Sequence, residues 1–288
     1  MFRWSREVEG DEEEHWASLL ELAEVFACFH QLPGRDEVRI EAFVQDEEQA
    51  RRMLELWGGE VVEIGDQDWV AVAAREWLGY VLPIRDRFVL TLDERPEFVD
   101  ALRVAHPDRE LLVFPPGLAF GTGDHATTAT CLDLLAAEAE SGGVEGREVL
   151  DLGCGTGILG IAAAKLGATR VDGLDNDPLA VAAAIRYWKD NGSPGGEGVA
   201  WAEADVLLWE PDQEYDLVLG NLFSDILRAA MPKIRRAVRP EGTVILSGIL
   251  AEQSGGVIES AMASGLRMVS RVDVGPWTTL RLVVEPRA

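Results

Sequence analysis

Val149-Leu-Asp-Leu-Gly-Cys-Gly-Thr-Gly-Ile-Leu-Gly160 is an apolar run that contains Asp151 and passes into a glycine-rich turn. This order predicts a buried strand, a tight turn and the start of a helix. Glycine suits the turn because it adopts positive φ and lets the backbone approach a ligand. Asp175 ends the next predicted strand, where its carboxylate can accept both ribose hydroxyls of a nucleoside. The stretch therefore predicts a nucleoside site at the ends of two neighbouring strands.

Apolar strands alternate with helices from Val149 to the C-terminus. This alternation predicts a parallel sheet covered by helices on both faces, with ligands beyond the carboxyl ends of the strands. Only Gly275 and Pro276 separate the last two strands, which is too few residues for a crossover, so this pair is expected to be antiparallel. The expected fold class is α/β, with a mixed seven-stranded sheet whose last strand is antiparallel. The predicted strands are 149–152, 170–174, 199–203, 216–219, 243–247, 268–274 and 277–284, and the predicted helices are 157–166, 178–191, 224–238 and 252–263.

Residues 1–65 have strands and helices in the order βαββαβ, which is typical of a small ferredoxin-like α+β domain. Asp46 precedes the second of these helices and can cap it. Residues 66–80 are predicted as a linker helix, and 81–288 as the domain that carries the glycine-rich turn. Two domains agree with a length of 288 residues. In the larger domain, strands are also predicted at 88–92 and 111–114, with a short helix between them and a longer helix from near Asp124.

The chain carries 51 acidic and 26 basic residues, a formal net charge of −25 at pH 7. This charge repels a phosphate backbone, so direct nucleic-acid binding is not expected. Two interpretations of the acidity stay open. One is adaptation to a high-salt cytoplasm, where screening weakens self-repulsion, and the other is attraction of a basic protein partner.

The three cysteines, Cys28, Cys131 and Cys154, are far apart and form no C-x-x-C pair. This spacing argues against a disulfide framework or a thiolate zinc site, and no metal site is expected. The charged N-terminus contains no apolar signal core, and no stretch has the roughly 18 apolar residues of a spanning helix. We therefore expect a cytoplasmic monomer with no membrane partner.

Two cofactors fit the glycine-rich turn. Gly155, Gly157 and Gly160 meet the weak pattern G-x-G-x-x-G, so an NAD-dependent oxidoreductase is one hypothesis. A pyrophosphate, however, favours positive potential at a helix N-terminus, whereas Asp151 precedes this turn and no Arg or Lys lies near it. S-adenosyl-L-methionine has no phosphate and carries an ammonium and a sulfonium, so an acidic site suits it better.

A second signature, Pro-Pro-Gly-Leu-Ala-Phe-Gly-Thr-Gly-Asp-His-Ala-Thr-Thr at 115–128, precedes a predicted helix. An ordinary connector rarely needs Gly117, Gly121 and Gly123 around a single Phe120. The three glycines suggest backbone that is folded tightly against a ligand.

This signature, with Gly-Asn-Leu-Phe at 220–223 and Leu-Ser-Gly-Ile-Leu at 246–250, closely resembles the ribosomal protein L11 methyltransferases. The glycine-rich turn resembles the first motif of class I methyltransferases, and Leu-Asp-Asn-Asp-Pro at 174–178 resembles their second. The resemblance covers about residues 66–288. It implies a Rossmann-like methyltransferase domain that uses S-adenosyl-L-methionine to methylate lysine side-chain amines, and the N-terminal amine, of the ribosomal protein.

The same resemblance implies that residues 1–65 hold the protein substrate and that a mobile linker reorients them. The cofactor contacts that it implies are Thr128, Gly153, Asp175 and Asn221, and the neighbouring candidates are Asp151, Gly155, Phe120 and Asp205. The usual Asn-Ile-Leu of the family is Asn-Leu-Phe here, at 221–223.

Asn221 is the candidate catalytic residue, because its amide can accept a hydrogen bond from the incoming amine and align the lone pair. His125 is the obvious titratable group for a general base, although a histidine in a tight loop often only bonds backbone. Phe120 and Phe223 are candidates for an apolar channel wall, or equally for core residues. Asp205 either faces the adenine amine or caps the short segment that follows it.

Three further hypotheses stay open. The acceptor can be another protein, such as an electron-transfer flavoprotein subunit. The enzyme can be the NAD-dependent oxidoreductase already mentioned. The chain can also be a noncatalytic adaptor that retains the cofactor pocket.

Overall fold

The computed structural model describes residues 2–23, 25, 27–31, 37–44, 46–63, 77–117, 121–192 and 198–285. Contacts divide the chain into two compact units, Met1–Glu76 and Trp77–Ala288. Most of the linker helix predicted at 66–80 lies outside the described residues, and its described part, 77–80, is not helical and contains a turn at 77–79.

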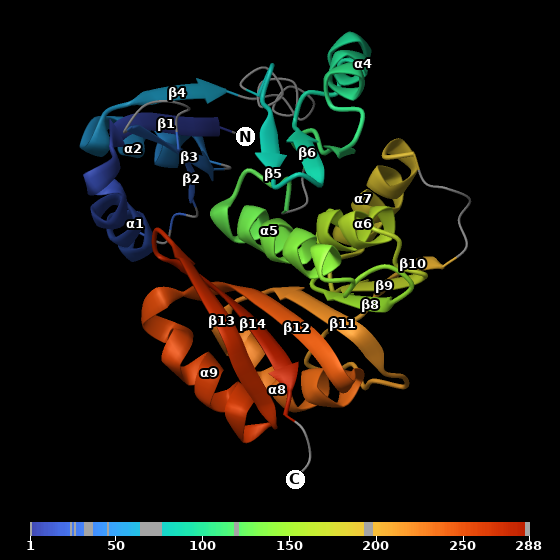
Figure 1. Ribbon diagram of the computed structural model, residues 1–288. Coiled ribbons are helices and arrows are strands. Elements are labelled where there is room, and N and C mark those ends of the chain that lie inside the picture. The colour runs from blue at the N-terminus through green and yellow to red at the C-terminus, as the bar shows by residue number, and fades with distance from the viewer. Residues whose placement is uncertain are drawn as a thin grey trace. The chain divides into compact units, whose positions relative to one another are not determined.

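The first unit contains a four-stranded antiparallel sheet with helices packed on it (Figure 1). The strand order is β2-β3-β1-β4, and β1 pairs with both β3 and β4. This is the order of a ferredoxin-like sandwich, as predicted. The elements are β1 (Phe2–Glu9), the 3-10 turn η1 (Gly10–Glu12), α1 (Glu13–Leu22), β2 (Ala27–Gln31), β3 (Glu37–Val44), α2 (Glu47–Trp57) and β4 (Glu60–Glu63).

Three tryptophans form the centre of this unit's core. The ring of Trp4, which is fully buried, lies 6.2 Å from the ring of Trp16 and 5.8 Å from that of Trp57. The indole N–H of Trp4 donates to the carbonyl of Gly58 at 2.7 Å, so its polar atom is satisfied. Asp46 caps α2 as predicted, since its carboxylate accepts the backbone N–H of Glu48 at 3.0 Å. The first unit therefore has a core of its own.

The second unit is built on a seven-stranded sheet in the order β10-β9-β8-β11-β12-β14-β13. The neighbours from β10 to β12 are parallel, whereas β14 is antiparallel to both β12 and β13. The predicted mixed sheet with an antiparallel last strand is therefore confirmed. The strands are β8 (Glu148–Leu152), β9 (Arg170–Asp175), β10 (Val199–Glu203), β11 (Tyr215–Asn221), β12 (Val238–Leu250), β13 (Leu266–Val274) and β14 (Trp277–Val284).

Helices cover both faces of this sheet and produce three layers (Figure 1). One face packs against α5 (Ala126–Glu140), α6 (Ile158–Lys165) and α7 (Pro178–Asp190), and the other against α8 (Ser224–Ala237) and α9 (Ser254–Ala263), which follows the 3-10 turn η2 (Ala251–Gln253). Successive residues of β8 enter opposite cores: Val149 faces the first layer, and Leu150 faces the second. Because side chains alternate along a strand, Asp151 points to the layer that contains α6.

A three-stranded sheet, β5 (Leu82–Ile84), β6 (Phe88–Thr91) and β7 (Glu110–Val113), precedes the main sheet in the chain, with α4 (Pro96–Ala105) between its last two strands. β6 and β7 were predicted, but β5 was not. It is only three residues long and contains Pro83, which edge strands tolerate because they need not donate on their outer side.

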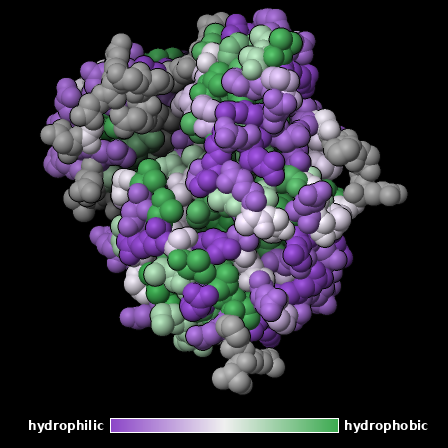
Figure 2. Space-filling model, viewed as in Figure 1, coloured by the Kyte–Doolittle hydropathy of each residue, from purple (hydrophilic) through white to green (hydrophobic). Residues whose placement is uncertain are grey.

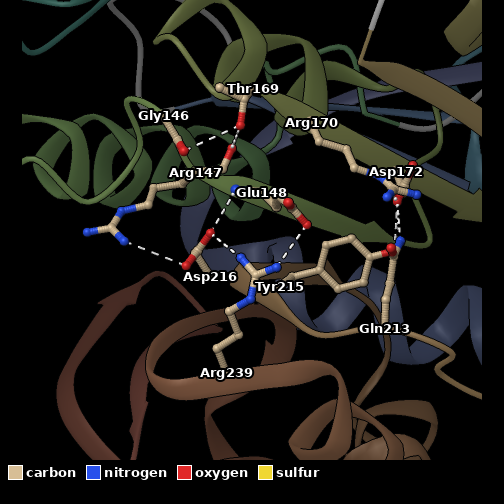
Figure 3. Close-up of polar contacts among 10 residues, drawn as sticks. All are labelled: Gly146, Arg147, Glu148, Thr169, Arg170, Asp172, Gln213, Tyr215, Asp216 and Arg239. Atoms are coloured by element: carbon tan, nitrogen blue, oxygen red, sulfur yellow. Dashed lines mark hydrogen bonds and ion pairs between the residues drawn. The ribbon is translucent and has the colours of Figure 1, made fainter.

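Polar contacts join the amino ends of the main strands (Figure 3). Arg239 on β12 bridges Asp216 on β11 at 2.7 Å and Glu148 on β8 at 3.0 Å. Asp216 also accepts the backbone N–H of Glu148 at 2.9 Å. Beside this group, the hydroxyl of Tyr215 donates to Asp172 on β9 at 2.7 Å, and Arg170 pairs with the same carboxylate at 2.9 Å. These contacts fix this end of the sheet.

Figure 2 shows hydrophilic residues over much of the displayed face, as expected for a chain that is 27% charged. None of the helices in the described part of the chain combines the length and apolar character needed to cross a membrane. The described residues also contain no group of three His, Cys, Asp or Glu side chains placed to hold a metal ion.

Candidate active site

The candidate site lies at the carboxyl edge of the main sheet, opposite the polar contacts of Figure 3. β8 is paired in parallel with β9 on one side and β11 on the other. Their last residues, Leu152, Asp175 and Asn221, therefore end at the same edge. Parallel α/β sheets bind ligands at this edge, so residues far apart in the sequence are brought together where chemistry is expected.

The glycine-rich turn follows β8 directly. Gly153, Gly155 and Gly157 all have positive φ, at 65°, 54° and 78°. A Cβ on Gly153 would lie only 2.2 Å from the side chain of Leu222 in the segment after β11. Conformation and space together therefore require glycine at Gly153.

Asp175 is bonded into this turn. One of its carboxylate oxygens accepts the backbone N–H of Gly155 at 2.8 Å, and the other accepts that of Asp177 at 3.0 Å. Each carboxylate oxygen has a second lone pair, so the group keeps capacity for two hydroxyl donors. The geometry suits the predicted ribose contact.

Asp151 is buried on the α6 side of β8, where its carboxylate accepts the backbone N–H of Gly160 at 2.9 Å. Burial raises the pKa of Asp151 to about 7, the bond from Gly160 opposes this rise, and the nearby charge of Asp175 adds to it. The edge of the sheet thus holds two carboxyl groups, one of which changes charge near neutral pH.

Trp201 on β10 explains the other glycines of the turn. A Cβ on Gly157 or Gly160 would lie 2.9 or 2.8 Å from the Trp201 ring, and one on Gly173 of β9 would lie 2.2 Å from it. These glycines make room for an indole between α6 and the sheet. Two of the three glycines that suggested a dinucleotide, Gly157 and Gly160, therefore have a packing reason.

The glycines of the second signature also pack against the protein. A Cβ on Gly123 would lie 2.3 Å from Leu90, one on Gly121 would lie 3.3 Å from the hydroxyl of Thr156, and one on Gly117 would lie 3.1 Å from that of Tyr187. Protein side chains therefore account for the need for glycine at these positions, and a contact of this backbone with a ligand stays a prediction.

Phe120 lies outside the described residues, and the flanking parts of its loop are held by hydrogen bonds. On one side, the Tyr187 hydroxyl donates to the carbonyl of Pro115 at 2.6 Å. On the other, the Thr156 hydroxyl donates to the carbonyl of Gly121 at 2.5 Å. The second signature is thus attached to α7 and to the glycine-rich turn.

His125 is the N-cap of α5. Its Nδ1 accepts the backbone N–H of Thr127 at 3.4 Å and lies 2.8 Å from the Thr127 hydroxyl oxygen. Its ring packs in a T-shaped arrangement with that of Trp277, at the start of β14, with centroids 5.1 Å apart and planes at 70°. The backbone bond that a loop histidine was expected to make is present.

Asn221 ends β11 beside the start of α5. Its amide nitrogen donates to the hydroxyl oxygens of Thr127 and Thr128, both at 3.2 Å. Both threonines are buried. The predicted residues Thr128 and Asn221 are therefore in direct contact, although they lie on different elements.

Asp205 follows β10, next to the end of β9, where the backbone N–H of Ala204 donates to the Asp175 carbonyl at 2.8 Å. Its carboxylate accepts the N–H of Leu207 at 2.8 Å and so caps the turn that follows. The capping alternative for Asp205 is therefore present, at a position adjacent to Asp175.

Phe223 is the N-cap of α8, two residues after Asn221, and its side chain is 70% exposed. The alternative of a core role for Phe223 was wrong. Leu222, between the two, packs against Gly153 and against Gly248 of β12. Phe223 is left on the surface beside the strand ends.

Three residues of this region were missed by the sequence analysis: Thr127, Thr156 and Trp277. Thr127 and Thr156 lie within the two quoted signatures, but a hydroxyl in a loop gives no signal of its partner. Trp277 lies after the Gly275-Pro276 turn, and only the antiparallel pairing of β14 with β12 brings it to the carboxyl edge.

A cavity of about 210 Å³ lies elsewhere in this unit, between the C-terminal ends of α4, α6 and α7. Its basic residues suit helix C-termini and already pair with carboxylates, so we do not assign it to the candidate site. The pairs are Arg103 with Asp100, Arg109 with Asp86, and Lys165 with Glu110.

Comparison with known families decides the class of this site. The model of the family described as ribosomal protein L11 methyltransferase (PrmA) matches residues 7–285. The chain belongs to this family. Membership confirms the resemblance seen in the two signatures, the methyltransferase class and, with it, S-adenosyl-L-methionine as the cofactor.

Individual relatives agree with this assignment. The chain is 39% identical over 214 residues to the ribosomal protein L11 methyltransferase of Pseudomonas paraeruginosa, which covers 72% of the chain and 67% of the relative. The relative from Pelotomaculum thermopropionicum is 36% identical over 217 residues, covering 75% of the chain and 66% of the relative. The chain thus matches about two thirds of the length of these relatives.

A solved structure confirms the α/β methyltransferase fold. The crystal structure of a ribosomal protein L11 methylase from Lactobacillus delbrueckii subsp. bulgaricus has a TM-score of 0.60 and 27% identity to the chain. The match covers 72% of this chain and all of that one.

The site's own chemistry fits the cofactor of the L11 methyltransferase family. Asp151 and Asp175 are acidic, and within the described part of the chain their carboxylates accept hydrogen bonds from backbone N–H groups and from no basic side chain. Carboxylates at this edge favour a ligand with hydroxyl donors and positive charge and disfavour a pyrophosphate.

Proposed function

We propose that this chain transfers methyl groups from S-adenosyl-L-methionine to lysine side-chain amines, and to the N-terminal amine, of ribosomal protein L11. The convergence of Asp175, Asp151 and Asn221 at one sheet edge, in a member of this family, carries the proposal. The relatives' names support the substrate, and the resemblance to this family implies the lysine specificity.

Gly153, Gly155, Asp175, Thr128 and Asn221 are the residues that we propose hold the cofactor. Asp175 accepts the ribose hydroxyls, and its bond to the N–H of Gly155 holds the backbone of the turn beside it. When ionised, Asp151 adds negative potential beneath the turn, and Asp205, which follows β10 next to Asp175, is the candidate to contact the adenine. When bound, the cofactor supplies a methyl carbon activated by its sulfonium.

The protein's part in the reaction is to present a neutral amine within roughly 3 to 3.5 Å of that carbon. Lysine has a reference pKa of about 10.4, so it must lose a proton, and an apolar entrance lowers its pKa. We propose that Phe223, exposed beside Asn221, forms one wall of this entrance, and that Phe120 contributes to it. Asn221 then accepts a hydrogen bond from the amine.

We also propose that residues 1–65 recognise the protein substrate. Ribosomal proteins that bind RNA are rich in basic residues, and a chain with a net charge of −25 attracts them over long range. The same charge opposes direct binding to RNA. A cytoplasmic location and a monomeric state complete the proposal.

Methyl transfer to purified L11 tests the proposal. Protein, labelled S-adenosyl-L-methionine and L11 are incubated, and mass spectrometry then locates the added methyl groups. We expect labelled methyl groups on lysine residues and on the N-terminal amine. Label on arginine or histidine would contradict the amine assignment.

Two controls separate the other hypotheses. Incubation with an extract from a strain that lacks the enzyme identifies a different acceptor, such as an electron-transfer flavoprotein subunit. Calorimetry with S-adenosylhomocysteine and with NADH separates a methyltransferase from an oxidoreductase. Binding of S-adenosylhomocysteine without transfer to any protein would indicate a noncatalytic adaptor.

A further inference from the structure

The amide of Asn221 is held in one orientation by two threonines. It has two N–H donors, and these meet two hydroxyl oxygens, those of Thr127 and Thr128, both at 3.2 Å. The nitrogen side of the amide is therefore fully used within the protein. The oxygen Oδ1 is the side that remains for a donor from outside.

A hydroxyl can act as donor or as acceptor. The Thr127 hydroxyl accepts reliably from the Asn221 amide only if its own proton is bonded to another acceptor. That acceptor is Nδ1 of His125, 2.8 Å from the Thr127 oxygen. Nδ1 also accepts the backbone N–H of Thr127, so it carries a lone pair and not a proton. The Thr127 hydroxyl therefore donates to His125 and accepts from Asn221.

The histidine is itself fixed. It caps α5, a helix of 15 residues, and its ring packs against Trp277 from the last strand. Thr127 is only 1% exposed, so it lies too deep to contact the substrate amine directly. Its hydroxyl can act on the reaction only through the groups that it bonds.

We infer that Thr127 is a positioning residue, which sets the hydrogen-bond direction from Asn221 to His125 and keeps Oδ1 of Asn221 turned to the methyl acceptor. His125 is then the terminal acceptor of this chain of bonds rather than the general base. The inference rests on the proposed function, because it takes the group that donates a hydrogen bond to Oδ1 of Asn221 to be a substrate amine.

Three variants of Thr127 and one matched control test the inference. Thr127→Val keeps the shape and removes the hydroxyl, whereas Thr127→Ser keeps the hydroxyl. The control, Thr243→Val, removes a buried hydroxyl that donates to Glu138 at 3.2 Å, away from Asn221. The third, Thr127→Val combined with Asn221→Ala, asks whether Thr127 acts through the amide.

We expect Thr127→Val to lower kcat for L11 methylation about tenfold, with KM for L11 and the affinity for S-adenosylhomocysteine changed less than about threefold. Thr127→Ser and Thr243→Val should keep kcat within about threefold of the unmodified protein. In the Asn221→Ala background, adding Thr127→Val should have no further effect, since coupled residues are not additive.

A kcat for Thr127→Val equal to that of Thr243→Val would overturn the inference, and so would a fully additive double variant. Should Thr127→Val not fold, Thr127→Ser decides, since a tenfold loss of kcat there contradicts a role for the hydroxyl. Failure of the proposed function would give a different result, because the unmodified protein itself would then transfer no methyl group to L11.

Discussion

The carboxylate of Asp175 accepts the backbone N–H of Gly155 at 2.8 Å, which ties the end of β9 to the turn that follows β8. A residue assigned to the ribose is thus also a structural support of the glycine-rich turn. Gly155 has a positive φ of 54°, and the bond holds its N–H in that conformation. Changes at Asp175 must therefore act on the ligand and on the loop together.

Asp175→Ala is expected to weaken binding of S-adenosylhomocysteine by about 100- to 10,000-fold. The physical reason is the loss of two charge-assisted bonds, each of roughly 1.5 to 3 kcal/mol, to the ribose hydroxyls. Asp175→Asn keeps an oxygen that can accept the N–H of Gly155, so its affinity for S-adenosylhomocysteine should lie between those of the unmodified protein and Asp175→Ala. Calorimetric titration measures all three affinities.

Asp177→Ala is the matched control for this prediction. Asp177 lies two residues later and caps α7, where its side chain accepts the N–H of Leu179 at 2.8 Å. Its removal should lower the free energy of unfolding by about 1 kcal/mol and leave cofactor affinity unchanged. Equal weakening of binding by both alanine variants would show that helix capping, and not ribose contact, controls affinity.

Asp151 is expected to make stability depend on pH. Its folded-state pKa is raised to about 7, above the ordinary value of 3.8, so the folded chain binds this proton more tightly than the unfolded chain does. The contribution of Asp151 to stability is therefore greatest below pH 4 and falls as the pH rises from about 4 to 7.

Asp151→Asn removes this titration and can still accept the N–H of Gly160. The free energy of unfolding of the unmodified chain should fall relative to that of the variant across this window, by about 4 kcal/mol at most. Urea denaturation at pH 4.5, 6 and 7.5 measures the difference. A constant difference between the two proteins would contradict a raised pKa.

Tyr187→Phe and Tyr215→Phe form a matched pair of changes. Each tyrosine is buried and hydrogen-bonded through its hydroxyl, Tyr187 to the loop at Pro115 and Tyr215 to Asp172 at the opposite edge (Figure 3). Each loss should destabilise the chain by about 1 to 2 kcal/mol. Only Tyr187→Phe is expected to reduce cofactor affinity, by several-fold, because α7 begins next to Asp175 and holds the second signature.

Chemical denaturation and calorimetry on the same two proteins check this expectation. If both variants bound S-adenosylhomocysteine as the unmodified chain does, the hydrogen bond from Tyr187 to Pro115 would stabilise the fold without affecting cofactor binding.

Local signals predicted the strand ends of this site well. The apolar run before Asp151 and the glycines after it are a contiguous pattern, and the parallel pairing that brings Asp175 and Asn221 beside it follows from the alternation of strands and helices. These features depend on short stretches of sequence, so the fold and the meeting of these three residues at one sheet edge were accessible without the structure.

Long-range packing was not accessible in the same way. Trp201 accounts for Gly160 and Gly173, yet nothing near either glycine in the sequence indicates an indole. The bond from Asn221 to Thr127 spans 94 residues. Its existence depends on how α5 meets the end of β11, which is decided by side-chain shape and not by a periodic pattern.

Phe223→Ala is expected to affect the acceptor and not the fold. Because the Phe223 side chain is 70% exposed, its removal should change the free energy of unfolding by no more than about 0.5 kcal/mol. Methylation assays over a range of L11 concentrations should show KM raised several-fold, since an apolar wall beside Asn221 would be lost, while S-adenosylhomocysteine binds as before. Met262→Ala on α9, with a side chain 62% exposed, is the control and should leave KM unchanged. An unaltered KM for Phe223→Ala would place the acceptor entrance on another side of Asn221.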